Sequence, residues 1–343
     1  MKIDDRSIGV EHPPYVIAEI SNNHLADPER ACRLIEMAAK TGADAVKIQT
    51  YDADSLTIDC DRPEFMIRTP PWVGMNYYQL YKKIALPADF SERLFRVARD
   101  CGITIFSSPF DEQAVAFLQS LNCPAYKVAS FEICDDPLLK AVGATGRPVL
   151  VSTGVASMTD IEEALRVLRE VGCRDIAFLH CVSAYPASTS EMNLRAIDRL
   201  ATLNCPVGLS DHSLNHLAAT LAVARGAVLI EKHFTLSRAD GGPDASFSLE
   251  PEEFKDLVRA VREAWETLGD EQILMQSSRP GIEHARSLFI VQPIGAGEEF
   301  RPDHIRAIRP GLGLPPRKLK SVLGRRARRN LDRGEPLRWE DIE

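Results

Sequence analysis

The sequence predicts an α/β fold, a (β/α)8 TIM barrel followed by a small second domain. Short apolar runs rich in Val, Ile and Ala recur over about 250 residues, the usual length of such a barrel. Helical patterns lie between these runs, as in a parallel sheet. A doubly wound sheet usually has fewer units and a Gly-rich turn after its first strand, and no such turn follows Ile20.

The predicted strands and helices alternate along the chain. The strands are Val16–Ile20, Ala45–Gln49, Ile103–Ser107, Ala125–Val128, Val149–Ser152, Ile176–Cys181, Val207–Ser210 and Val228–Lys232. The clearest helices are Pro28–Lys40, Phe90–Cys101, Asp111–Leu121, Asp160–Val171, Leu214–Arg225 and Pro251–Leu268. Several helices end at a glycine, such as Gly42 and Gly172, because glycine readily adopts the left-handed conformation that closes a helix.

The connection from Thr50 to Leu86 is unusually long and contains several Pro, Trp and Tyr residues. Long connections without clear periodicity are often functional. We therefore expect this segment to act as a lid over the site.

The composition shifts toward Arg and Pro near the C-terminus. We expect the barrel to cover residues 1–275, a linker 276–284, and a second domain 285–343 with β-like runs such as Ser287–Val291. A domain of this size carries only a small core, so we expect it to pack against something else.

The charge and cysteine patterns restrict the class of protein. The formal net charge is -8, although residues 281–343 hold 13 Lys/Arg against 9 Asp/Glu. The arginines at 325–329 lack interleaved aromatic residues, which favours a solvated face over nucleic-acid binding. No export signal and no apolar run of about 18 residues is present, so we expect a soluble protein without membrane contact. The eight cysteines are dispersed, which predicts reduced thiols in a cytoplasmic protein.

Polar residues stand at the carboxyl ends of the predicted strands, where active sites of these barrels are built. They are Glu19, Lys47, Gln49, Ser107, Ser108, Lys127, Ser130, Glu132, Ser152, Thr153, His180, Ser183, Tyr185, Ser210, Asp211, His212, Glu231, Lys232 and His233.

Lys47 and Lys127 lie in strands that are otherwise apolar, where an unpaired ammonium is costly. Together with serine hydroxyls, two lysines favour a site for a small phosphorylated carboxylate. The alternative is a structural role, in which the lysines form buried ion pairs with Glu19 and Glu132.

His212 and His233 end neighbouring strands, so both imidazoles can reach one ion. Two His with oxygen ligands suit Mn²⁺, Co²⁺, Fe²⁺ or Zn²⁺. We expect a divalent metal, Mn²⁺ first, with Mg²⁺ or Co²⁺ as alternatives. Glu19, Glu231 and Asp244 are candidates to support its water shell.

Other chemistries have less support. HExxH, CxxC and GxSxG motifs are all missing from the sequence. Lys127 offers a second mechanism, a Schiff base as in aldolases, because a lysine beside another lysine can have a depressed pKa.

Eight segments in order resemble the sialic acid synthase family. They are Ala18–His24, Val46–Gln49, Ser107–Asp111, Tyr126–Ser130, Ser152–Gly154, His180–Cys181 with Tyr185–Pro186, Gly208–His212 and Glu231–Thr235. Ile308–Gly311 resembles the antifreeze-like (SAF) domain of that family. Three further segments, Ala129–Ile133, Ser183–Pro186 and Gly241–Pro251, look more like the pseudaminic acid synthases than the N-acetylneuraminate synthases. Residues 22–23 and Met75–Ala88 depart from the pattern, and both lie near the expected sugar site.

The resemblance implies a role for each site residue. Phosphoenolpyruvate would be held by Lys47, Ser108, Lys127, Ser130, Ser152, Ser183 and Ser210. The metal would be bound by His212 and His233, with Glu19 near the metal and the reacting water. The sugar would face Gln49, Tyr185, Asp244 and Glu132, and Arg309 would reach it from a partner chain in a domain-swapped homodimer.

The implied reaction is a metal-dependent condensation of phosphoenolpyruvate with 2,4-diacetamido-2,4,6-trideoxy-L-altrose. It gives a nonulosonic acid and phosphate. Two alternatives stay open: an N-acetylneuraminate or legionaminate synthase using a manno-configured N-acetylated amino sugar, and a barrel that binds sugar or anion without catalysis. The retention of both lysines and both histidines argues against the last.

Overall fold

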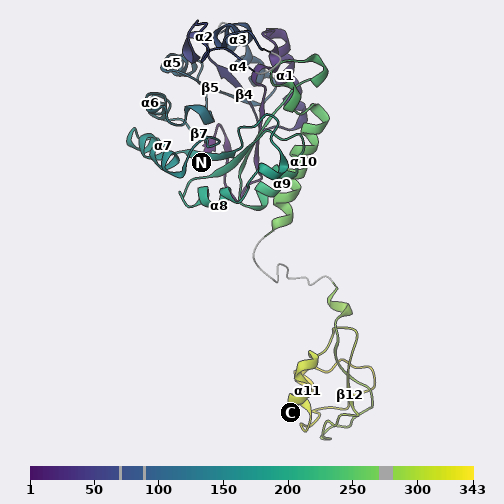
Figure 1. Ribbon diagram of the computed structural model, residues 1–343. Coiled ribbons are helices and arrows are strands. Elements are labelled where there is room, and N and C mark those ends of the chain that lie inside the picture. Colours follow the sequence, from purple (N-terminus) through teal and green to yellow (C-terminus); the bar gives the residue numbers. More distant parts are fainter. Residues whose placement is uncertain (69–71, 88–89, 270–280) are drawn as a thin grey trace. The chain divides into compact units, whose positions relative to one another are not determined.

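The computed structural model describes residues 1–68, 72–87, 90–269 and 281–343. The chain forms two compact units, Met1–Gly269 and Asp270–Glu343 (Figure 1). The first contains a closed barrel of eight parallel strands in the order β10-β3-β4-β5-β6-β7-β8-β9, which confirms the predicted fold class.

Helices surround the barrel (Figure 1). The barrel strands are β3 (Tyr15–Glu19), β4 (Ala45–Thr50), β5 (Thr104–Pro109), β6 (Tyr126–Val128), β7 (Val149–Ser152), β8 (Ile176–Cys181), β9 (Val207–Asp211) and β10 (Leu229–His233). The helices are α1 (Pro28–Thr41), α4 (Ser91–Asp100), α5 (Glu112–Ser120), α6 (Asp136–Ala144), α7 (Met158–Glu170), α8 (Ala196–Ala201), α9 (Leu217–Ala224) and α10 (Pro251–Leu268).

Local sequence signals fix where these helices begin and end. The Asp27 side chain accepts a hydrogen bond from the Glu29 N–H at the start of α1, and Pro28 takes the first helical position. Gly42 ends the helix with φ at +84°. The strands are nearly all buried on both faces, because helices cover the outside and side chains fill the inside.

The segment after β4 contains two short helices, α2 (Ala53–Leu56) and α3 (Tyr77–Ile84). Ile67, Leu80 and Ile84 form an apolar cluster of their own, apart from the barrel core. The predicted long connection is therefore partly helical, while Pro70 and Pro71 lie outside the described residues. Its action as a lid stays a prediction.

The second unit pairs β11 (Ser287–Ile290) with β12 (Ile305–Ile308) in antiparallel register and includes α11 (Leu319–Val322). A small core of its own includes Leu288, Phe300 and Val322. Of the predicted linker, residues 276–280 lie outside the described residues. The predicted domain limits stay predictions.

Two further observations concern the whole chain. All eight cysteines are free. Among the described residues, no helix has both the length and the hydropathy needed to cross a membrane.

Candidate active site

A cavity of about 560 Å³ opens at the carboxyl ends of the barrel strands. Of the barrel residues to which the resemblance assigns a role, all line it except Ser108 and Ser183, which contact the lining residues Lys47 and Cys181. Among the other polar residues at strand ends, Ser107, Thr153, His180, Asp211 and Lys232 do not line it. The closed barrel thus brings together side chains at the carboxyl ends of strands that are far apart in the sequence.

Four charged residues meet at the floor of this cavity, and each is at most 4% exposed. The Lys47 Nζ lies 2.8 Å from Glu19 Oε2 and 3.6 Å from Glu231 Oε1. The Lys127 Nζ lies 3.3 Å from Glu231 Oε1, so Glu231 and not Glu132 is its carboxylate partner. Buried charges need such partners, because an isolated ion in the interior is very costly.

Burial and neighbouring charges shift the pKa values of the groups in this cluster. Burial alone would raise the pKa of Glu231, but Lys127 and Lys47 outweigh it and lower that pKa below its usual range. Burial raises the pKa of Glu19 even beside Lys47. Burial, joined by the charge of Lys47, lowers the pKa of Lys127.

Hydroxyl groups gather at the ends of β6, β7 and β8. Ser130 Oγ accepts a hydrogen bond from the Gly154 N–H at 3.1 Å, and Ser152 Oγ is buried without a partner. A Cβ on Gly154 would lie 2.3 Å from Ser183 Oγ and 2.9 Å from Ser130 Oγ. This close gathering of donors around a glycine backbone forms a cradle for an anion.

Two imidazoles stand at the ends of β9 and β10. The rings of His212 and His233 have centroids 5.3 Å apart. Nδ1 of His212 donates to the Val182 carbonyl at 2.8 Å, so Nε2 is the ring nitrogen that remains for another partner. Nδ1 of His233 is buried without a hydrogen-bond partner, and burial followed by the charge of His212 lowers its pKa well below the usual value.

These two rings fit a transition-metal ion. His233 has a buried ring nitrogen without a hydrogen-bond partner, and imidazole nitrogens are common ligands of such ions. Within the described part of the chain, no group of three or more His, Cys, Asp or Glu is arranged to hold a metal. An ion here would therefore take its remaining ligands from water or substrate, which is the open arrangement of catalytic sites.

The residues predicted to face the sugar lie around the same cavity. The Gln49 amide donates to Glu19 Oε1 at 3.2 Å and to Ser21 Oγ at 2.9 Å. The Tyr185 ring lies 4.4 Å from that of His212. Glu132 also lines the cavity, with a buried oxygen that has no partner.

Arg309 belongs to the second unit, where it follows β12. Its predicted approach to a partner's site stays a prediction.

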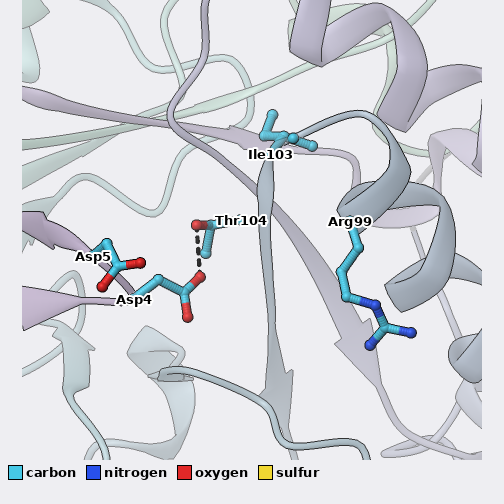
Figure 2. Close-up of a pocket in the computed structure, with 6 residues that line it drawn as sticks. Asp4, Asp5, Arg99, Ile103 and Thr104 are labelled. Carbon is cyan, nitrogen blue, oxygen red and sulfur yellow. Dashed lines mark hydrogen bonds between the residues drawn. The ribbon is translucent and has the colours of Figure 1, made fainter.

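A second hollow lies at the opposite end of the barrel, before β5. Asp4, Asp5, Arg99 and Thr104 line it, and Figure 2 shows the Arg99 side chain standing apart from both carboxylates. The only contact drawn there joins Thr104 Oγ1 to Asp4 Oδ2 at 2.8 Å (Figure 2). These polar groups do not converge, so the hollow offers no comparable site.

Several residues of the cavity wall were not among the predicted binding residues. They are Asn22, Tyr51, Leu56, Trp72, Leu80, Tyr81, Phe110, Phe131, Cys181 and Phe247. Asn22, Leu80 and Tyr81 fall in the two segments that depart from the family pattern near the expected sugar site. The other residues have no chemical signature in the sequence that would select them. Glu231 was only a candidate to support the metal, yet it lies two residues before His233, on the same inward face of its strand.

The fold and the site define a (β/α)8 barrel protein with two lysines, several serine hydroxyls and two imidazoles around one cavity. The chain belongs to the NeuB family, which matches residues 34–273, and residues 285–343 match the SAF domain.

Similar proteins agree with this assignment. A pseudaminic acid synthase of Helicobacter pylori is 39% identical over 96% of this chain and 98% of its own length. An N,N'-diacetyllegionaminic acid synthase of Legionella pneumophila is 34% identical over 96% of this chain and 94% of its own length. The crystal structure of an N-acetylneuraminic acid synthetase from Leptospira borgpetersenii has a TM-score of 0.73 and 31% identity, and covers 81% of this chain and 92% of that one.

Proposed function

We propose that this protein is a pseudaminic acid synthase that condenses phosphoenolpyruvate with 2,4-diacetamido-2,4,6-trideoxy-L-altrose. The observation that carries the proposal is the meeting of two buried lysines and a hydroxyl cradle with two imidazoles in one cavity. The lysines and hydroxyls suit a phosphorylated carboxylate, and the imidazoles end the neighbouring strands β9 and β10.

The residues supply position and charge rather than a covalent bond. Lys47, Lys127 and the cradle hold phosphoenolpyruvate so that its C3 faces the aldehyde carbon of the sugar. A carbon–carbon bond forms between them, which leaves a cation at C2 and an alkoxide at the former aldehyde oxygen; the alkoxide takes up the proton that the attacking water loses. Water then adds to C2, and phosphate leaves with its bridging oxygen as the C2–O bond breaks. Glu19, with its raised pKa, is placed to exchange the proton of this water.

His212 and His233 would hold a divalent metal, Mn²⁺ first, with Mg²⁺ or Co²⁺ as alternatives. When bound, such an ion supplies Lewis acidity at a carbonyl oxygen. We expect His212→Ala to weaken Mn²⁺ binding at least tenfold, measured by the electron paramagnetic resonance of free Mn²⁺. A control is His284→Ala, whose side chain is exposed in the second unit. Unchanged binding in His212→Ala would contradict the metal assignment.

The choice of sugar rests on the higher identity to pseudaminic acid synthases, 39% against 34% for a legionaminic acid synthase. Purified protein is incubated with Mn²⁺, phosphoenolpyruvate and each candidate sugar, and phosphate release and product mass are measured. Turnover of the altro-configured sugar alone supports the proposal. Turnover of a manno-configured sugar instead would assign an N-acetylneuraminate or legionaminate synthase. No release with any sugar would favour a binding protein without catalysis.

The lowered pKa of Lys127 favours one competing mechanism, a Schiff base with a carbonyl substrate. Borohydride added during turnover would trap that species as a covalent adduct visible by mass. We expect no adduct, because the Glu231 carboxylate 3.3 Å from the Lys127 Nζ favours the charged form of this amine, which is not a nucleophile. An adduct that disappears in Lys127→Gln but persists in Lys140→Gln, at an exposed site, would establish the aldolase mechanism.

We also propose a domain-swapped homodimer, in which Arg309 of one chain reaches the sugar bound in the barrel of the other. The proposal rests on the family resemblance of the second unit to SAF domains.

A further inference from the structure

The rim of the cavity divides into three sectors because of the strand order of the barrel. The hydroxyl cradle lies over β6, β7 and β8, and the imidazoles lie over β9 and β10. Residues after β3, β4 and β5 form the third sector. With the anion held by the cradle and by the two lysines of the floor, and the reacting aldehyde beside the second sector, the side chains that stand above the floor in the third sector are left for the far end of the sugar.

This third sector is an aromatic wall. It consists of Tyr51 and Phe110, which follow β4 and β5, and of Trp72, Leu80 and Tyr81 from the segment after β4. The Tyr51 ring meets those of Phe110 and Tyr81 edge to face, with centroids 5.5 Å and 6.0 Å apart. The wall is thus packed in a fixed arrangement.

The polar groups at the edge of the wall, on Tyr51, Asn22 and Asp244, form hydrogen bonds with one another. The Tyr51 hydroxyl donates to Asn22 Oδ1 at 2.9 Å. The backbone N–H and the amide nitrogen of Asn22 both donate to Asp244 Oδ2, each at 3.1 Å. The Tyr51 proton and one lone pair of Asn22 Oδ1 are therefore used by each other, so a sugar hydroxyl at this wall would have to compete for them. A hydroxyl that is buried here without a full set of partners is therefore disfavoured relative to a methyl group.

We propose that this aromatic wall receives the C6 methyl group of a 6-deoxy sugar and discriminates against a C6 hydroxymethyl group. This inference rests on the proposed function, whose substrate is deoxygenated at C6. The expected discrimination is roughly 10- to 100-fold in kcat/KM, because an apolar pocket rejects an added hydroxyl only to this extent. Residues 22–23 and 75–88, where the sequence departs from the family pattern, both contribute to the wall through Asn22, Leu80 and Tyr81.

The test compares two sugars that differ only at C6: 2,4-diacetamido-2,4,6-trideoxy-L-altrose and 2,4-diacetamido-2,4-dideoxy-L-altrose. Wild-type protein should prefer the first by at least about tenfold in kcat/KM. Tyr51→Phe removes the hydroxyl that occupies Asn22 Oδ1, which frees that oxygen to accept a bond from the C6 hydroxyl. The ratio of the two kcat/KM values should then fall about fivefold to tenfold.

A second variant and a control complete the experiment. Trp72→Ala removes apolar surface from the wall, so kcat/KM should fall more for the 6-deoxy sugar than for its hydroxylated counterpart. Tyr78→Phe removes a hydroxyl from the same segment, where it contacts Asp54 at the surface, and should leave the ratio unchanged.

The outcomes separate the two proposals. Product from both sugars with kcat/KM values within twofold, or a ratio unmoved in both wall variants, would overturn the aromatic-wall inference and leave the synthase standing. No product from either sugar, with product from a manno-configured sugar, would overturn the assigned substrate and the inference with it.

Discussion

Position 154 has no room for a side chain, because the hydroxyls of Ser183 and Ser130 occupy the space that a Cβ would need. In Gly154→Ala the new methyl group would lie 2.3 Å from Ser183 Oγ and 2.9 Å from Ser130 Oγ, so both hydroxyls must move. We expect the KM for phosphoenolpyruvate to rise about tenfold or more, since one or two charge-assisted hydrogen bonds are lost. The control is Gly9→Ala, where the added methyl group meets nothing within 4 Å. Equal KM values in the two variants would show that the cradle does not bind the substrate.

His24 connects the stability of the barrel to pH. It is 5% exposed, its Nδ1 accepts a hydrogen bond from the Ala26 N–H, and burial followed by the charge of Arg30 lowers its pKa to about 4. Between about pH 4 and 6.5 the unfolded chain binds a proton that the folded chain does not, so stability falls as the pH is lowered through this range.

Between pH 7 and 5 this histidine should therefore remove about 2 kcal/mol from the free energy of unfolding. His24→Asn keeps an acceptor oxygen but cannot titrate. Urea unfolding at both pH values should show a smaller loss in the variant than in the wild type. A loss of the same size in both would mean that His24 is not the titrating group.

At the scale of elements, β9 and β10 are joined by an ion pair on their outer faces. The Lys232 Nζ lies 2.6 Å from Asp211 Oδ2, both side chains are fully buried, and the ammonium also donates to Ser213 Oγ and the Asn215 carbonyl. These contacts hold the segment after β9 against β10. The inward neighbours of the pair are the two imidazoles.

Lys232→Met should destabilise the fold by about 3–5 kcal/mol, because it leaves the Asp211 carboxylate buried without a countercharge. Adding Asp211→Asn should restore part of this loss, because the amide oxygen still accepts from the Ser213 N–H. Denaturant unfolding measures both effects. Arg166→Met breaks an exposed pair with Glu170 and serves as the control. A Lys232→Met midpoint equal to that of the control would contradict the role of the pair.

Two other strands, β7 and β8, show how much of the fold could be predicted from the sequence. Val149–Ser152 and Ile176–Cys181 coincide with β7 and β8, because long apolar runs between turn residues define a buried strand. The short hairpin of β1 (Lys2–Ile3) and β2 (Arg6–Ser7) was not predicted, since two-residue strands have no periodicity. Neither were α6 and α8. Helix α8 is short, with 6 residues, whereas α6 was missed although its buried residues Leu138, Leu139 and Val142 have helical spacing.

Side-chain partners were harder to predict than positions. The sequence placed Lys127 at a strand end, but its partner Glu231 lies on a strand 104 residues away. Only the closure of the barrel brings the two together across its interior. The aromatic wall depends likewise on the packing of α3 and on the bond from Tyr51 to Asn22, neither of which leaves a pattern in the sequence.

At the scale of the whole molecule, the proposed swap of SAF domains makes each active site depend on two chains. A dimer of that kind has a property that an unswapped one lacks. Two defective variants can complement each other when their defects lie in different parts of one shared site.

Lys127→Gln and Arg309→Ala are the pair to combine, each inactive or impaired by itself. In a mixed dimer, the barrel with an intact Lys127 would receive Arg309 from the other chain, and the second site would carry both defects. Since one of its two sites is intact, the mixed dimer should have about half of the wild-type activity. Coexpression with two affinity tags allows the mixed dimer to be isolated and its phosphate release measured. If Arg309 acts within its own chain, every mixed site carries one defect, and activity would stay at the level of Arg309→Ala.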